Sequence, residues 1–220
     1  MQYPKHAIIL AAGLGSRLGM DLPKCLVDLH GRKLIDYQLD LLKLFADVRV
    51  VVGFKEEDVI SYVSKIRSDC VFVRNPDYFK TTNVCSAKLG TKYITRPFVI
   101  MDGDIYIPPQ DFQAFISICI SSDTDVVGVT PTKSEEPVYA HVSNGILTHF
   151  SLTEYSQYEW AGLAYIKNAD FQQFNIGYIY QILANYLPAP ASIINVYEVD
   201  TPQDYSMLLQ NVVINNPTTF

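Results

Sequence analysis

A chain of 220 residues, 49% of them hydrophobic and 18% charged, can bury one full core, so we expect a single globular domain over residues 1–220. The net charge of −6 argues against nucleic-acid binding through a broad basic surface, although a small phosphorylated molecule needs only a local cluster of positive charge. We find no Cys-x-x-Cys spacing, no apolar run as long as a membrane span and no evident secretory signal, so we expect a cytoplasmic protein.

The first predicted element is the strand 7–10, and the segment after it is the most informative part of the sequence. Positions 10 to 24 read Leu-Ala-Ala-Gly-Leu-Gly-Ser-Arg-Leu-Gly-Met-Asp-Leu-Pro-Lys. Gly13 and Gly15 let backbone amides approach an anion, and Arg17 and Lys24 add positive charge to the same turn. We interpret this segment as a phosphate-binding loop.

Two familiar glycine motifs do not fit this loop. The dinucleotide-binding pattern needs its third glycine at position 18, which is a leucine, and its acidic residue would have to be Asp36 or Asp40, inside a predicted helix. The Walker pattern needs glycine, lysine and a hydroxyl residue from position 18, where the chain has Leu-Gly-Met. The remaining pattern resembles the signature of the nucleotidyltransferase (NTP transferase) family, which includes small phosphocholine cytidylyltransferases and sugar-phosphate nucleotidylyltransferases. The matching residues are Gly13, Gly15, Ser16, Arg17, Pro23 and Lys24.

Strand-like and helical stretches alternate along the rest of the chain, which favours an α/β fold with a mainly parallel central sheet and helices on both faces. The resemblance implies a Rossmann-like domain of the nucleotidyltransferase and GT-A-like type. The expected elements after the loop are a helix at 33–45, a strand at 48–52, a helix at 56–67, a strand at 70–73, a helix at 83–93, a strand at 98–101, a helix at 109–121, a strand at 126–130, a hairpin at 144–145, two short helices before position 187, a last strand at 193–199, and a terminal helix begun by Thr201 and Pro202.

Acidic residues follow two of the predicted strands. Asp102-Gly103-Asp104 ends the strand 98–101, and Asp200 follows the last strand. Ligands gather at the carboxyl ends of strands in open α/β sheets, so Asp104 and Asp200 are placed to hold Mg²⁺ against a nucleotide phosphate. The resemblance implies the same role for these two acids. Asp102 can instead be a turn residue, and Asp200 can instead cap a helix.

These parts predict a phosphoryl-type transfer. A phosphomonoester would attack the α-phosphate of an NTP and pyrophosphate would leave, a step that needs positioning and charge neutralisation more than a protein nucleophile. Arg17 would neutralise the β- and γ-phosphates, and Lys24 would bridge the attacking phosphate and the α-phosphate. The four histidines are scattered in the sequence and none is assigned to catalysis: His6, His30, His141 and His149.

The resemblance also implies where the nucleotide binds. Base recognition would use backbone groups at the start of the loop and polar residues near position 83, which can alternatively form a turn or cap a helix. The predicted nucleotide-binding set is Ala11, Ala12, Gly13, Gly15, Ser16, Thr82, Asn83 and Ser86. The order and spacing of four segments, 78–89, 102–106, 160–165 and 197–205, resemble the small phosphocholine cytidylyltransferases, which use CTP.

The acceptor pocket is expected between positions 130 and 159, where the resemblance is weakest. Aromatic residues around this region could enclose a quaternary ammonium group by cation–π attraction, or pack in the core. They are Tyr155, Tyr158, Trp160 and Tyr165. Glu154 and Glu159 would favour a cationic acceptor. The short connection from Arg17 to Lys24 resembles instead the methylerythritol, inositol and N-acetylglucosamine phosphate branches of the family.

The leading hypothesis is therefore a Mg²⁺-dependent cytidylyltransferase that binds CTP and a small phosphorylated acceptor such as phosphocholine. One alternative is a sugar-1-phosphate nucleotidyltransferase that uses UTP, GTP or dTTP. A second is a glycosyltransferase that uses an NDP-sugar, because Asp102-Gly103-Asp104 matches an Asp-x-Asp metal motif. A third is a nucleotide-sensing module without activity. The oligomeric state stays open.

Overall fold

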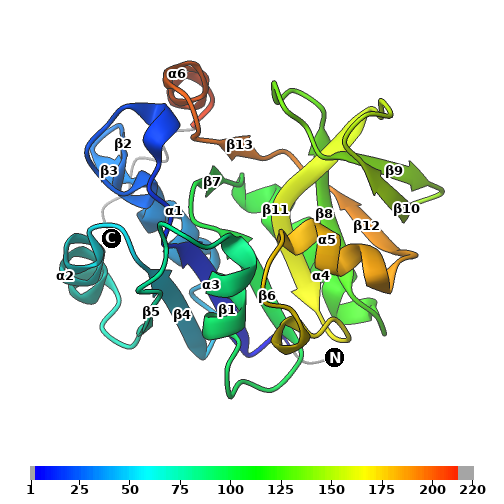
Figure 1. Cartoon of the computed structure of the whole chain (residues 1–220), viewed down its shortest axis with the longest axis horizontal. Coiled ribbons are helices and arrows are strands. Elements are labelled where there is room, and N and C mark those ends of the chain that lie inside the picture. The colour runs from blue at the N-terminus through cyan, green and yellow to red at the C-terminus, as the bar shows by residue number, and fades with distance from the viewer. Residues whose placement is uncertain (1–2, 213–220) are drawn as a thin grey trace.

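The computed structural model describes residues 3–212, and its centre is a nine-stranded mixed sheet (Figure 1). The strand order is β5-β4-β1-β6-β11-β8-β12-β10-β9. The strands of this sheet are β1 (His6–Ala11), β4 (Asp47–Val52), β5 (Val71–Arg74), β6 (Phe98–Asp102), β8 (Val126–Pro131), β9 (Tyr139–Ser143), β10 (Ile146–Ser151), β11 (Tyr158–Ile166) and β12 (Ala189–Ile193). Two short ribbons pair β2 (Asp28–Leu29) with β3 (Arg32–Lys33), and β7 (Ile105–Tyr106) with β13 (Tyr197–Glu198).

The sheet is mixed. Strands β5, β4, β1 and β6 run parallel, and β8 pairs in parallel with β12. Strand β11 lies antiparallel between β6 and β8, and β9 and β10 form an antiparallel hairpin at the edge. Most strands therefore share one direction, but the reversal of β11 in the middle of the sheet was not part of the expectation. An apolar run such as β11 is buried on both faces, and its pattern carries no information about strand direction.

Helices cover both faces of the sheet, as expected. The helices are α1 (Leu34–Leu41), α2 (Glu56–Ile66), α3 (Asn83–Gly90), α4 (Pro109–Ser121), α5 (Ile179–Leu183) and α6 (Pro202–Asn211). Residues of α1, α2 and α4 share one buried apolar cluster with one face of the sheet, and residues of α3 and α5 share a second cluster with the other face. In Figure 1, α3 and α5 lie in front of the sheet. None of the helices in the described part of the chain combines the length and the apolar character that a membrane crossing requires.

Most predicted helices and strands are confirmed within a few residues, but the last predicted strand is wrong. The segment expected at 193–199 is divided between β12, which begins at Ala189, and β13, which begins at Tyr197. Pro188 and Pro190 hide β12 in the sequence, because proline cannot donate to a strand ladder. The terminal helix begins as predicted, with the Thr201 hydroxyl accepting a hydrogen bond from the backbone of Asp204.

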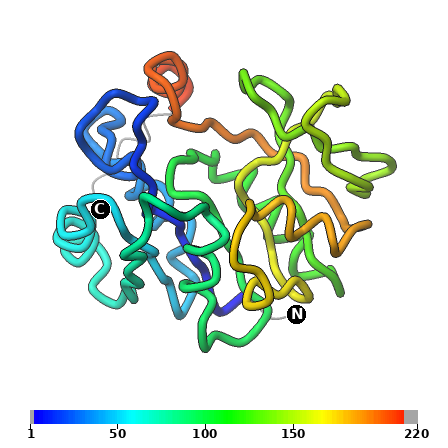
Figure 2. Tube along the Cα trace, viewed as in Figure 1, coloured from blue at the N-terminus to red at the C-terminus, as the bar shows by residue number. Residues whose placement is uncertain are grey.

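The C-terminal segment returns to the N-terminal half of the molecule. Figure 2 shows the orange segment after β12 crossing to α6, which lies beside the blue N-terminal part. The backbone N–H of Val199 donates to the carbonyl of Asp104 at 2.8 Å, and the Tyr205 hydroxyl donates to the carbonyl of Asp28 at 2.6 Å. Leu18 and Leu208 share a third buried cluster. Residues near position 200 are thereby fixed next to the phosphate-binding loop.

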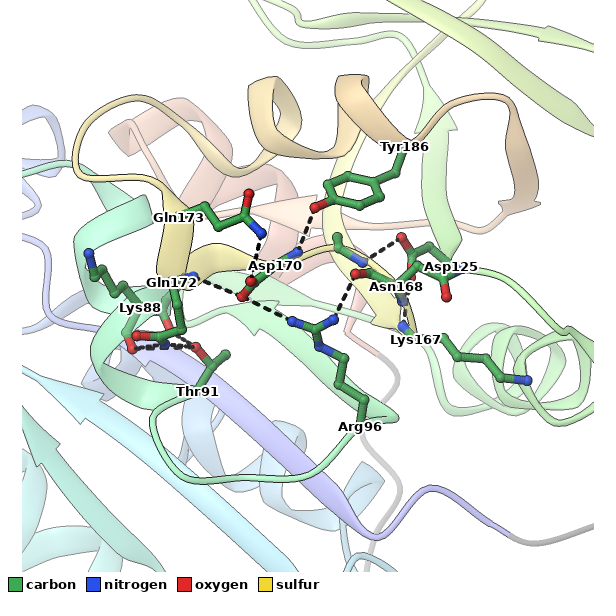
Figure 3. Close-up of polar contacts among 12 residues, drawn as sticks. Lys88, Thr91, Arg96, Asp125, Lys167, Asn168, Asp170, Gln172, Gln173 and Tyr186 are labelled. Atoms are coloured by element: carbon green, nitrogen blue, oxygen red, sulfur yellow. Dashed lines mark hydrogen bonds and ion pairs between the residues drawn. The ribbon is translucent and has the colours of Figure 1, made fainter.

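A polar network fixes the end of α3 that lies away from its first turn (Figure 3). The Gln172 amide donates to the carbonyl of Lys88 at 2.8 Å and to the Thr91 hydroxyl at 3.1 Å. Arg96 donates to the carbonyl of Asn168 at 2.7 Å and pairs with Asp170 at 3.0 Å. The network joins α3 to the segment after β11. The network thereby holds α3 in place, and the first turn of α3 faces a cleft at the carboxyl ends of β1 and β6.

Candidate active site

A cleft opens at the carboxyl ends of β1 and β6, beside the first turn of α3. Most of the predicted nucleotide-binding residues line it: Ala11, Ala12, Gly13, Gly15, Thr82, Asn83 and Ser86. Lys24 and Asp104 line the same cleft. Ser16 and Arg17 lie in the short 3₁₀ turn that follows Gly15 and are not part of the lining. The cleft also includes Tyr78, Thr81, Asp102 and Glu198, which were absent from the predicted set.

Two glycines are required by the backbone around this cleft. Gly15 has φ +62°, and a Cβ built there would lie 2.9 Å from Cγ of Lys24. A side chain at this position would therefore strain the loop and displace Lys24. Gly103 lies where β6 approaches β1, and a Cβ there would lie 2.7 Å from the carbonyl oxygen of Leu10. The two glycines let the loop and the Asp-Gly-Asp turn come together.

Lys24 joins the two predicted metal-binding acids. Its Nζ lies 2.8 Å from Asp104 Oδ2 and 2.6 Å from Asp200 Oδ1. Arg17 contacts the other carboxylate oxygen of Asp200 and lies 3.8 Å from Glu136. Burial lowers the pKa of Lys24, but the charges and hydrogen bonds of Asp104 and Asp200 outweigh it and raise that pKa above its ordinary value. Lys24 is therefore charged throughout the physiological range.

Two further carboxyl groups complete an acidic cluster in the cleft. Loss of solvation and the charge of Asp104 raise the pKa of Asp102 to about 8, against a smaller opposing effect of the charge of Lys24. Loss of solvation and the same charge raise the pKa of Glu198 to about 8. With these raised pKa values Asp102 and Glu198 are largely protonated at neutral pH, and a cation that enters the cluster would displace their protons. The sequence signal for Glu198 was its place two residues before Asp200, in Glu-Val-Asp.

The polar residues around the start of α3 also hold the cleft wall. Asn75 is 1% exposed, and its amide donates to the hydroxyls of Thr81 at 3.1 Å and Ser86 at 3.0 Å. The Thr82 hydroxyl donates to the carbonyl of Gly177, and the side-chain oxygen of Asn83 accepts from the backbone of Ile179 at 3.3 Å. Thr82 is the N-cap of α3 without a side-chain capping bond. These contacts hold residues 81–86 against the segment that precedes α5.

The predicted aromatic enclosure does not form. Tyr165 is 5% exposed and lies in the cluster shared with α4, whereas Tyr158 and Trp160 pack on the opposite face of the sheet. Tyr155 is 74% exposed and contacts Tyr139. None of the four lines the cleft. Alternation along β11, with a bulge between positions 160 and 164, sends neighbouring aromatic residues to different faces.

The two glutamates expected to favour a cationic acceptor are also in other environments. Glu159 is 3% exposed, and its Oε1 accepts hydrogen bonds from the backbone of Lys133 and from the backbone and hydroxyl of Ser134. Glu159 therefore holds the connection between β8 and β9. Glu154 lies in the loop after β10, where its carboxylate is 3.6 Å from the ring of His149.

Comparison with known proteins places this geometry in a family. The model of the MobA-like NTP transferase domain matches residues 7–160. The chain belongs to this family. The match includes the glycine loop, Lys24, α3 and the Asp-Gly-Asp turn, and it ends before Glu198 and Asp200.

Relatives of this MobA-like domain include cytidylyltransferases. A CTP:phosphoglutamine cytidylyltransferase from Campylobacter jejuni is 39% identical over 84 residues, which cover 36% of this chain and 33% of that protein. The chain thus spans about a third of the length of that relative. A choline-phosphate cytidylyltransferase from Haemophilus influenzae is 21% identical over 231 residues, covering 96% of this chain and 98% of that protein.

The fold is shared over nearly the whole length with solved structures. The inositol-1-phosphate CTP transferase from T. maritima superposes with a TM-score of 0.78 at 19% identity, covering 95% of each chain. The C-terminal segment that carries Asp200 is therefore part of a known architecture, although it lies outside the matched family domain.

Proposed function

We propose that this chain transfers CMP from CTP to a small phosphomonoester and releases pyrophosphate. The observation that carries the proposal is the position of Lys24, which lies between Asp104 and Asp200 in a cleft that also contains the glycine loop. A half-buried, positively charged lysine beside an amide-rich turn suits a site where negative charge is concentrated on phosphates.

In this proposal the triphosphate lies over Gly13 and Gly15, with Arg17 against the outer phosphates. An oxygen of the acceptor phosphate attacks the α-phosphorus, the bond from that phosphorus to the bridging oxygen breaks, and pyrophosphate leaves with the electron pair. Lys24 would release its carboxylate partners and neutralise the α-phosphate and the attacking phosphate in the transition state. The nucleophile is already ionised at neutral pH, so the step needs no general base.

The donor set of the acidic cluster fits Mg²⁺. Asp104 and Asp200 both direct a carboxylate oxygen to Lys24 Nζ, so their oxygens lie close enough to share one cation. Carboxylate oxygens are the ligands that Mg²⁺ prefers, and we propose these two acids as its holders. When bound, the ion would supply charge stabilisation for the phosphates.

The acceptor would enter beside the β8–β9 connection, residues 132–138. Arg17 approaches this connection through Glu136, and Lys133 lies 4.2 Å from the centre of the Tyr197 ring. The carboxylate of Glu136 on this side favours an acceptor with a positively charged group, such as phosphocholine or phosphoethanolamine. Two cytidylyltransferase relatives whose names specify choline phosphate and phosphoglutamine support a small acceptor of this kind.

The test is pyrophosphate release by the purified chain with each of CTP, UTP, GTP and dTTP against phosphocholine, phosphoethanolamine, inositol phosphate and hexose 1-phosphates. We expect turnover with CTP and a phosphorylated amine. Turnover only with a hexose 1-phosphate and another NTP would replace this proposal by the sugar-phosphate alternative. Release of free NDP from an NDP-sugar without pyrophosphate would indicate a glycosyltransferase. Tight CTP binding without turnover of any acceptor would indicate a sensing module.

A further inference from the structure

The β9–β10 hairpin (Figure 1) carries a pair of histidines that do not line the cleft. His141 and His149 are directly opposite each other in the antiparallel register, and their rings stack with centroids 4.1 Å apart and planes 11° from parallel. Glu154 follows in the loop after β10. One ligand atom from each of these three residues lies within 4.8 Å of the other two. We propose that His141, His149 and Glu154 form a surface site for a divalent transition metal such as Zn²⁺, Co²⁺ or Ni²⁺.

Hydrogen bonds set the tautomer of His149. The Thr148 hydroxyl donates its single proton to the carbonyl of His141 at 3.0 Å, so it accepts from Nδ1 of His149 at 3.1 Å. The neutral ring of His149 then has its lone pair on Nε2, which faces Oε2 of Glu154 at 3.6 Å. Either a proton or a metal ion can lie between Nε2 and the carboxylate oxygen. The hydrogen bond at Nδ1 therefore leaves Nε2 and Glu154 as the pair of ligand atoms that would bind a metal.

His141 is held in the same way. Its Nε2 lies 3.2 Å from the carbonyl oxygen of Glu154, which can only accept, so Nε2 carries the proton and Nδ1 keeps the lone pair. Each histidine also has the outer hydrogen bond to a hydroxyl or carbonyl that orients metal-binding imidazoles in proteins.

The donor set selects the class of metal. Two imidazole nitrogens and one carboxylate oxygen suit Zn²⁺ and its neighbours, whereas Mg²⁺ prefers oxygen ligands alone. The side chains of His149 and Glu154 are 52% and 71% exposed, so water can complete the coordination. None of the three residues lines the cleft, and the site is independent of the proposed transferase function. A bound metal would tie the hairpin to the loop that leads into β11.

The direct test uses the histidine rings of the full chain, prepared without a histidine tag and labelled with ¹⁵N-histidine. The sequence has only four histidines, so each ring can be followed while Zn²⁺ is added in the presence of excess Mg²⁺. We expect the signals of His141 and His149 to shift and saturate at one equivalent. His6, which pairs with Asp47, and His30, which contacts the carbonyl of Leu209, should not move. Unchanged signals, or four rings that broaden together, would overturn the proposal.

Variants separate this site from the acidic cluster of the cleft. We expect His149→Ala to weaken Zn²⁺ binding by about 100-fold or more, and Thr148→Val to weaken it by about tenfold through loss of the outer hydrogen bond. His30→Ala, a histidine elsewhere on the surface, is the matched control and should bind as the native chain does. The double variant Asp104→Asn, Asp200→Asn should also keep the site. Native affinity in a folded His149→Ala protein, or loss of binding in the double variant, would overturn the assignment.

Discussion

The two sides proposed for the substrates are built in different ways. The proposed nucleotide side, residues 10–15 and 78–86, comes from two short continuous segments, one at the end of β1 and the other leading into α3. The proposed acceptor side, residues 132–138 with Glu198, comes from segments far apart in the sequence, which are positioned by pairing with β11 and β7 and meet where Lys133 contacts Tyr197. A function carried by one segment can be recognised in a sequence, whereas a pocket made by distant segments depends on how the sheet is assembled.

The largest expected effect tests the nucleotide side. Changing Lys24 to Gln keeps a polar side chain but removes the charge that neutralises the reacting phosphates, and we expect kcat to fall by about 10³-fold. Stopped or coupled pyrophosphate assays measure the loss, with circular dichroism to check the fold. Lys133→Gln is the matched variant on the acceptor side, where the lysine lies over the Tyr197 ring, and its kcat should stay within about fivefold of native. Equal losses in the two variants would remove the distinction between the sides.

The next effect concerns stability. Asp125 is 2% exposed, and its carboxylate accepts three backbone hydrogen bonds from residues 167–169, at 2.6, 2.6 and 3.0 Å. Asp125→Ala leaves those donors buried and unpaired, so we expect the free energy of unfolding to fall by about 3 kcal/mol in urea titrations. Asp123, which pairs with Lys167 at the surface, is the control, and Asp123→Ala should leave the urea midpoint nearly unchanged. A small effect at Asp125 would mean that the turn after β11 is held by other contacts.

The smallest effect tests the acceptor side. Glu136→Gln removes a negative charge near Arg17, and we expect the KM for phosphocholine to rise about threefold while the KM for CTP stays the same. Initial-rate measurements with each substrate varied separately give the two constants. Tyr155→Ala, at an exposed position away from the cleft, should change neither. A lower KM for the acceptor in Glu136→Gln would indicate an acceptor without positive charge.

Most residues of the proposed nucleotide side lie together in one cleft as the sequence predicted, because the signals that group them are local. Gly15 and Lys24 lie nine residues apart and meet in one turn, and Thr201 with Pro202 marks the start of α6 by capping chemistry alone. The positions of Asp104 and Asp200 beside Lys24 followed from the rule that ligands gather at the carboxyl ends of strands.

The acceptor side could not be predicted, for physical reasons. Side chains alternate between the two faces along β11, so Trp160 and Tyr165, five residues apart, lie on opposite faces of the sheet and cannot enclose one ligand. Glu159 was expected to favour a cationic acceptor, but its carboxylate accepts hydrogen bonds from Ser134 in the β8–β9 connection. The pairing of His141 with His149 needs the hairpin register, which spacing along the chain does not reveal.

Because the C-terminal segment returns to the N-terminal half of the molecule, the cleft is completed late in the synthesis of the chain. The glycine loop, Lys24 and α3 are synthesised early, and the strands that support them pair in parallel among themselves. Asp200 is added only after β12 and β13, and it reaches Lys24 across 176 positions of sequence. A nascent chain would therefore assemble its phosphate cradle well before its second carboxylate, and catalytic competence would come as one of the last events of folding.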